Sequence, residues 1–194
     1  MATIELSLPD RLSSGNSIRY WASRYPNFEC DKDDWIRDKI QSAYSDAGHL
    51  TFDDLRCLGI WKNGSERGTR HFPKSERVIA RETRKAYEAA DIEILLNLGG
   101  LQYPMASSLM HFALPHKYPI IDRRALATLG MRPEEGKEIY INKQLWEEYR
   151  GFCLDRSKHY EVSLRMLDRA LWQFDSEDSF WQKYDPQRST ANLN

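Results

Sequence analysis

Apolar residues recur three or four positions apart through most of the chain, and this spacing predicts α-helices. Between residues 32 and 47 the apolar positions fall on one face of a helix, and Gly48 is expected to end it. Thr51 followed three positions later by Asp54 forms a capping-box pattern, so a second helix is expected to begin there. No segment alternates apolar and polar residues with the period of two that strands show.

The rest of the chain is interpreted in the same way. Further helices are expected from Pro73 to about Ala90, from Asp91 to Leu98, over Tyr103–Leu114, from Asp122 to Gly130, and near residues 143–156 and 159–174. Residues 1–17 and 63–72 are expected to be irregular, residues 115–121 extended, and the C-terminal end frayed. Few of the expected helices exceed about fifteen residues, which favours an orthogonal multi-helical fold. We therefore predict an all-α protein with a single domain over residues 1–194.

Composition and cysteine content restrict the class of protein further. Hydrophobic residues make up 41% of the chain, enough for a buried core, and no apolar run reaches the roughly 20 residues of a membrane span. The N-terminal residues lack the basic-then-apolar order of a signal peptide. Cys30, Cys57 and Cys153 lie far apart, and the histidines show no metal-ligand spacing. We therefore expect reduced thiols, no metal site and a cytoplasmic location.

Charge is segregated along the chain, although the formal net charge is only −1. Residues 62–85 contain eight Lys or Arg and three Glu, whereas residues 29–56 contain eight acidic and four basic residues. This distribution permits one basic face on a nearly neutral protein, and a basic face is typical of nucleic-acid-binding proteins. The other interpretation is a helix whose arginines are simply solvated.

One segment combines a glycine turn with an acidic residue that precedes a helix. Residues 98–102 read Leu-Gly-Gly-Leu-Gln and are followed by the expected helix over 103–114, and residues 118–122 read Tyr-Pro-Ile-Ile-Asp. A glycine turn before a helix points backbone N–H groups outward, where they can hold a phosphate oxygen. Asp122 is expected at the N-terminus of the next helix, where the dipole and free N–H groups favour its ionised form.

This segment resembles the helix-hairpin-helix (HhH-GPD) DNA glycosylase superfamily over about residues 90–130. In that family a hairpin that reads L-P-G-V-G precedes a helix, and a catalytic aspartate follows the first hairpin glycine by 22 residues. Leu98 through Gln102 stand on the five hairpin positions, and Gly100 plus 22 is Asp122. The stretch from His49 to Lys62 is also similar to a bacterial branch with an 8-oxoguanine DNA glycosylase fold.

The resemblance implies a protein of base-excision repair type, with double-stranded, damaged DNA as its partner and Asp122 as its catalytic residue. It also implies phosphate contacts from the hairpin, with nearby basic residues adding to them. The residues expected to contact nucleic acid are Gly100, Leu101, Gln102, Tyr103, Lys117, Arg123 and Arg124, and in the basic loop Lys62, Arg67, Arg70 and Lys74. The hairpin of this superfamily often holds a monovalent cation through backbone carbonyls, and no organic cofactor is implied.

Three departures from the family pattern restrict the expected chemistry. Gln102 replaces the second hairpin glycine, which changes the turn and its cation site. Pro104 occupies the position of the Schiff-base lysine of bifunctional members, so base release without a lyase step is expected. The four cysteines that hold an iron–sulfur cluster in some members are absent, so no such cluster is expected.

Two other functions stay open on the same residues. A non-catalytic helix-hairpin-helix module would bind DNA with strong salt dependence and release no base. A helical interaction protein would have no nucleic-acid role, and the nearly neutral net charge favours it. Taken alone, Asp122 is explained as a helix N-cap, and Gly99-Gly100 as an ordinary turn between helices.

Overall fold

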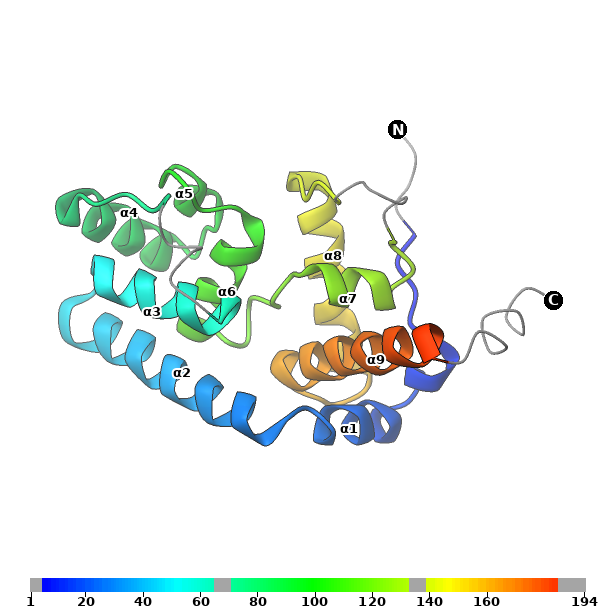
Figure 1. The fold of residues 1–194 in the computed structure, drawn as a ribbon. Coiled ribbons are helices and arrows are strands. Elements are labelled where there is room, and N and C mark those ends of the chain that lie inside the picture. The colour runs from blue at the N-terminus through cyan, green and yellow to red at the C-terminus, as the bar shows by residue number, and fades with distance from the viewer. Residues whose placement is uncertain (1–4, 65–70, 133–138, 185–194) are drawn as a thin grey trace. The chain divides into compact units, whose positions relative to one another are not determined.

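The computed structural model describes residues 5–64, 71–132 and 139–184, and all of their regular secondary structure is helical (Figure 1). The elements are a 3-10 turn η1 (Asp10–Leu12) and the helices α1 (Gly15–Ser23), α2 (Asn27–Ala47), α3 (Phe52–Asn63), α4 (Glu76–Ala89), α5 (Glu93–Leu96), α6 (Tyr103–Ala113), α7 (Arg123–Thr128), α8 (Lys143–His159) and α9 (Leu164–Tyr184). The predicted all-α class is confirmed, and no strand occurs in these described ranges. None of their helices combines the length and apolarity needed to cross a membrane.

The chain divides into two compact units, which are described separately. The hairpin unit comprises residues 26–121 and 141–150, and the terminal unit comprises residues 1–25, 122–140 and 151–194. Helix α8 contributes its first part to the hairpin unit and the rest to the terminal unit. The single domain over residues 1–194 stays a prediction.

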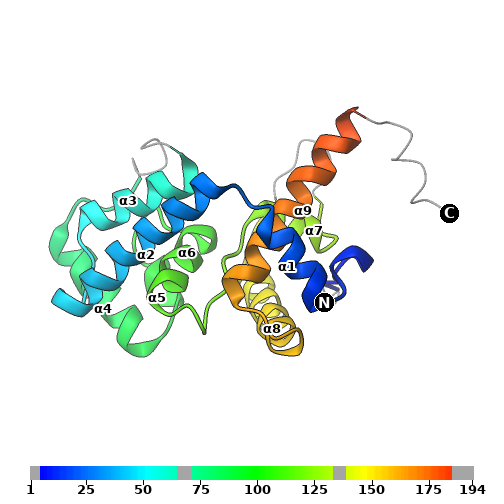
Figure 2. The same cartoon turned by 90° about the horizontal axis from the view of Figure 1, so that it is seen from below.

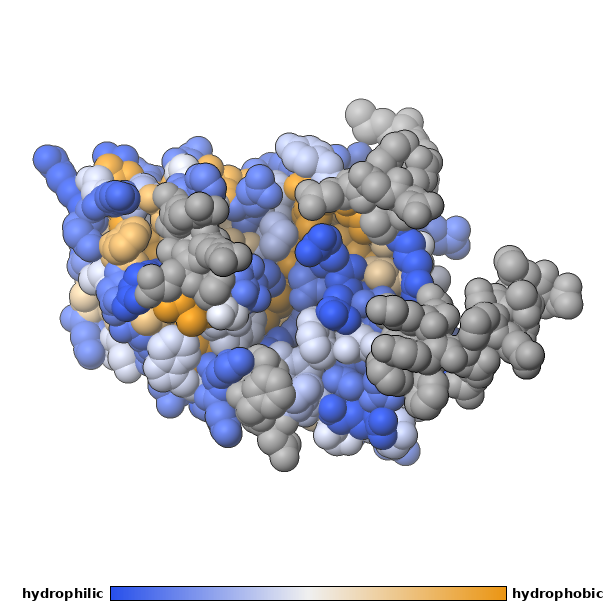
Figure 3. Space-filling view, viewed as in Figure 1, coloured by the Kyte–Doolittle hydropathy of each residue, from blue (hydrophilic) through white to orange (hydrophobic). Residues whose placement is uncertain are grey.

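The core of the hairpin unit is formed by the inward faces of α2 to α6 (Figure 2). Helix α2 packs on α3 and α6, and α4 packs on α5. The fully buried apolar side chains on these helices include Ile36, Ile40, Leu55, Leu58, Ile79, Leu95 and Leu109. At the C-terminal end of α2, Tyr44 stacks on Tyr87 of α4 at 4.2 Å between ring centroids. The face of this unit shown in Figure 3 mixes hydrophilic and apolar side chains.

The terminal unit is organised around α9, which packs against α1 and α7. Trp21 of α1 meets Phe174 of α9 edge to face, with 5.0 Å between ring centroids. The Thr128 hydroxyl of α7 donates to the Leu171 carbonyl of α9 at 2.8 Å. These contacts bury an apolar stripe on α9, which is why this long helix is stable beside two short ones.

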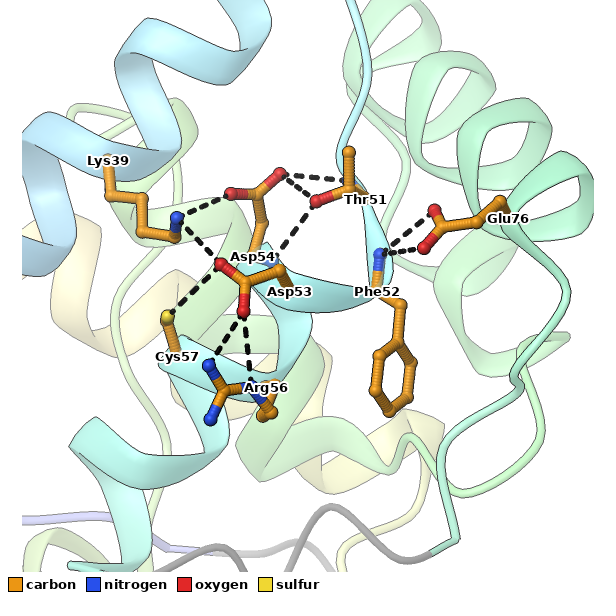
Figure 4. Close-up of polar contacts among 8 residues, drawn as sticks. All are labelled: Lys39, Thr51, Phe52, Asp53, Asp54, Arg56, Cys57 and Glu76. Carbon is orange, nitrogen blue, oxygen red and sulfur yellow. Dashed lines mark hydrogen bonds and ion pairs between the residues drawn. The ribbon is translucent and has the colours of Figure 1, made fainter.

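The capping box predicted at the start of α3 is confirmed (Figure 4). The Asp54 carboxylate accepts from the Thr51 N–H at 2.9 Å and from the Thr51 hydroxyl at 2.7 Å, while the Thr51 hydroxyl accepts from the Asp54 N–H. Lys39 of α2 lies 3.3 Å from Asp54 and 3.0 Å from Asp53. Hydrogen bonds from Arg56 and then Lys39 lower the pKa of the Asp53 carboxyl. The start of α3 is thereby joined to α2.

Several predicted boundaries are wrong, and capping chemistry explains one of them. Residues 1–17 were expected to be irregular, but Ser14 and Ser17 form a reciprocal capping box that begins α1. Pro73 was expected in the first turn of α4, which instead begins at Glu76 after Ser75. Helix α2 begins five residues earlier than expected, and α9 continues to Tyr184. Three helices, α2, α8 and α9, exceed fifteen residues.

Replacing Asp54 with alanine should lower the free energy of unfolding by about 2 kcal/mol, because the capping box is lost and the half-buried Thr51 N–H loses its acceptor. Urea denaturation measures the change. Asp46→Ala is the matched control, since Asp46 is an exposed aspartate of α2 outside this cluster. Equal stability of the two variants would show that the capping box contributes little.

Candidate nucleic-acid interface

The predicted hairpin connects α5 and α6 in the hairpin unit and consists of residues 97–102. Leu98 and Leu101 are buried and anchor the turn to the core. Gly99, Gly100 and Gln102 are exposed between and beside these anchors. The two helices expected from the sequence therefore flank a six-residue connection, in which Leu98 and Leu101 are buried and the other four residues are exposed.

Of the two glycines of this turn, Gly100 stands at the position where the fold leaves no room for a side chain. Its φ is +86°, a left-handed conformation that residues with a Cβ rarely adopt. A Cβ at this position would also lie 2.6 Å from the carbonyl carbon of His71 and closer still to its oxygen. The backbone before α4 thus packs directly against the hairpin, which only glycine permits.

The hairpin leaves backbone donors without acceptors. The Leu101 N–H donates to the Leu98 carbonyl at 3.1 Å. Within the described part of the chain, the N–H groups of Gly99, Gly100 and Gln102 donate to no protein acceptor. Gln102 is also the N-cap of α6 and makes no side-chain capping bond. Unused donors at an exposed helix N-terminus are the groups that bind anions.

Two of the predicted contact residues in the hairpin face inward. Leu101 is buried, and Tyr103 is 7% exposed with its hydroxyl donating to Glu93 at 2.6 Å. Any contact that these residues make with nucleic acid would come from their backbone. Gly100 and Gln102, by contrast, are exposed as predicted for contact residues.

An aromatic stack that sequence analysis missed supports the hairpin from within its unit. Trp146 of α8 lies parallel to Tyr118, with 6.4 Å between centroids, and stacks on Tyr103 at 6.0 Å. The Tyr118 hydroxyl donates to the Ala90 carbonyl, and burial raises its pKa. The guanidinium of Arg150 lies over the Tyr118 ring and donates to the Lys117 carbonyl at 3.1 Å. This stack fixes the end of the link that precedes Asp122.

Asp122 caps α7 in the terminal unit, as the sequence predicted. Its Oδ1 accepts from the Ala125 N–H at 2.9 Å. Among the described residues no donor reaches Oδ2, and the side chain is half-buried. One carboxylate oxygen is therefore committed to the helix and the other is not. The expectation that Asp122 faces an open cleft stays a prediction.

The arginines after Asp122 lie on the surface of the terminal unit. Arg124 lies 3.5 Å from Asp175 of α9, and its guanidinium lies 4.8 Å from the centroid of the Trp172 ring. Arg132 approaches the other oxygen of Asp175 at 3.9 Å. Asp175 is buried, and it holds two exposed guanidinium groups in place. Arg123 is exposed as well.

The basic loop expected between α3 and α4 is described only at its ends. Lys62 is half-buried, with its ammonium 5.8 Å from the Trp61 ring centroid, and Lys74 is exposed. Arg67 and Arg70 lie outside the described residues. Lys117, in the link before Asp122, is exposed. The hairpin, Lys62, Lys74 and Lys117 belong to the hairpin unit, whereas Asp122, Arg123 and Arg124 belong to the terminal unit.

Comparison with known proteins adds no family assignment. No family model, no curated protein and no solved structure matches this chain. Among the described residues, no three His, Cys, Asp or Glu side chains gather as ligands for a metal ion. The glycosylase resemblance therefore stays a prediction carried by residues 90–130.

Replacing Gly100 with alanine should lower the free energy of unfolding by about 2–4 kcal/mol. The alanine would have to adopt a left-handed φ, and its Cβ would collide with the His71 backbone. Gly99→Ala is the matched control, since a Cβ there meets nothing within 4 Å. Its effect should stay within about 1 kcal/mol. Equal losses in the two variants, measured by urea denaturation, would contradict the packing described here.

Proposed function

We propose that this protein binds damaged duplex DNA and acts as a monofunctional DNA N-glycosylase. The observation that carries the proposal is the exposed glycine turn before α6, whose N–H groups at Gly99, Gly100 and Gln102 have no acceptor in the described chain. A DNA phosphate is an anion that such donors can bind without a side-chain charge. The 22-residue offset from Gly100 to Asp122, the offset of the glycosylase superfamily, supports the same function.

The proposed reaction needs a base outside the helical stack. An enzyme that acts on the glycosidic bond flips the target nucleotide from the duplex into a pocket. Binding of a neighbouring phosphate by the hairpin would hold the backbone while the nucleotide rotates. The buried Leu98 and Leu101 side chains would anchor the turn to the core while it holds the phosphate.

Asp122 is the residue proposed to assist bond cleavage. As the C1′–N bond breaks, the base leaves with the bonding electrons and positive charge develops on the sugar. An ionised carboxylate opposes that charge and can orient the water that adds to C1′. In Asp122 the Oδ1 atom accepts from Ala125, and Oδ2 lacks a donor among the described residues, so one oxygen is available for this role.

The proposed reaction ends with base release. Pro104 stands at the start of α6, and a proline offers no amine for a Schiff base with the opened sugar. Water is therefore the nucleophile in this proposal, and the DNA strand stays intact at the abasic site.

A non-catalytic DNA-binding module is the second candidate. The bond from Ala125 to Asp122 favours it, because the N-cap role alone is a sufficient structural reason for an aspartate at this position. Such a protein would keep the hairpin and its phosphate contacts, and it would release no base. Base release is the measurement that separates the two candidates.

Asp122→Asn should reduce base release by at least about 100-fold, because asparagine still caps α7 but lacks the negative charge that opposes the developing cation. The assay uses duplexes that each carry one altered base, such as uracil, 8-oxoguanine or an alkylated purine, and detects the free base. DNA binding and the free energy of unfolding should change little.

Asp91→Asn is the matched control for this variant. Asp91 also accepts from a helix-start N–H, that of Glu93 at 2.9 Å, and the proposal gives it no chemical role. Its base release should equal that of the wild type. Wild-type protein that binds the duplexes and releases no base from any of them would reject the glycosylase and leave the binding module.

Gln102→Glu should weaken duplex binding by about tenfold at low salt, because it puts a carboxylate beside the N–H groups proposed to hold a phosphate. Fluorescence anisotropy with a labelled duplex measures the affinity. Asn16→Asp adds the same charge at an exposed position of α1 and should leave binding unchanged. Equal affinity of both variants would exclude the hairpin from the interface.

A further inference from the structure

Helix α4 carries a stripe of basic side chains that the sequence analysis did not assign to the interface. Its exposed positions include Arg77, Arg81, Arg84 and Lys85, hereafter the α4 stripe. They follow one another at intervals of four, three and one residues, which keeps them on one side of a helix. The opposite side of α4 holds the buried residues Ile79, Thr83 and Ala86.

Contacts within the unit engage the charged groups of three members of the α4 stripe. Arg81 forms an ion pair with the mostly buried Glu82, and Lys85 lies 4.0 Å from the same carboxylate. Arg84 donates to the Ala47 carbonyl at the end of α2, at 3.1 Å. Arg77 has no bonding partner in the described chain. The four side chains are thus exposed, and three of them are pre-oriented.

Exposed aspartates are concentrated on a different helix of this unit, although α4 also carries the exposed Glu76 and Glu88. Exposed aspartates line α2 at Asp31, Asp34, Asp38 and Asp46. The charge segregation along the sequence therefore becomes a difference between two helices of one unit, and α2 disfavours an anion more strongly than α4 does.

We propose that the α4 stripe binds backbone phosphates of the same duplex that the hairpin holds, an inference that rests on the proposed function. Helix α4 packs on α5, and the segment before α4 contacts Gly100, so the stripe and the hairpin belong to one compact unit. From Arg77 to Lys85 the stripe extends about 12 Å along the helix axis. One DNA strand carries a phosphate about every 3.4 Å along its axis, so the stripe spans about four phosphates.

The composition of the stripe favours a nucleic acid over other anionic partners. Three of its four members are arginines, whose planar guanidinium groups bind phosphate oxygens in pairs. The exposed large hydrophobic residues in the described chain are Tyr20, Trp35 and Tyr140, and none of them lies on α4. The centre of a protein–protein interface is depleted in charge and enriched in aromatic residues, and α4 offers no exposed aromatic residue beside its charges.

The test compares how steeply DNA binding falls with salt in two variants of equal charge. Arg77→Gln/Lys85→Gln removes two stripe charges, and Lys32→Gln/Arg37→Gln removes two charges from α2. Losing two phosphate contacts should reduce the slope of log affinity against log salt by about 1.8, which is about 60-fold in affinity at about 0.1 M salt if the curves meet near 1 M. The α2 variant should keep the wild-type slope.

The possible results separate the α4 stripe from the hairpin. A wild-type slope in the stripe variant, together with weakened binding in Gln102→Glu, would overturn the α4 stripe and leave the hairpin. Absence of duplex binding in the wild type would overturn both. Stripe-dependent binding to vesicles of phosphatidylserine and phosphatidylcholine that exceeds binding to DNA would assign the stripe to a lipid surface instead.

Discussion

The backbone of His71 lies against Gly100, and this contact joins the segment before α4 to the turn before α6. No side chain fits between the two backbones, so the approach requires glycine at position 100, where φ is also positive. The consequence extends beyond the turn. This packing contact, together with the packing of α4 on α5, holds the proposed phosphate donors of the hairpin beside α4 in one unit.

Local patterns in the sequence predicted those parts of the fold that local chemistry decides. The helix starts at Thr51 and Asp122 were found because a side chain bonds an N–H three positions on. The start of α1 was missed, although Ser14 and Ser17 form the same kind of box, because serines near Gly15 also suit an irregular segment. The stack of Tyr103, Trp146 and Tyr118 joins residues far apart in the chain, and periodicity along a sequence carries no signal for such contacts.

The candidate residues belong to two different units, and those of the two units were unequally predictable. The glycine turn and its unused N–H groups belong to the hairpin unit, and a short motif with a defined backbone conformation is enough to indicate them. The surroundings of Asp122 depend on α9, whose Asp175 holds Arg124 and Arg132 and whose Trp172 lies under Arg124. Arg124 was expected to contact nucleic acid, and in the structure it pairs with Asp175 of α9. Changing it would therefore alter the contact between α7 and α9 as well as the surface charge.

A net charge of −1 does not weigh against nucleic-acid binding in a chain whose charges are separated in space. Salt screens charges over about 8 Å at physiological ionic strength, so a bound phosphate responds to the residues within that distance. A phosphate at the α4 stripe would lie beside arginines that are held by Glu82 and the end of α2. The aspartates along the exposed face of α2 would act mainly at longer range, by disfavouring the approach of DNA to that helix. Local charge would therefore determine affinity for DNA, while the acidic helix would determine which face of the unit the DNA meets.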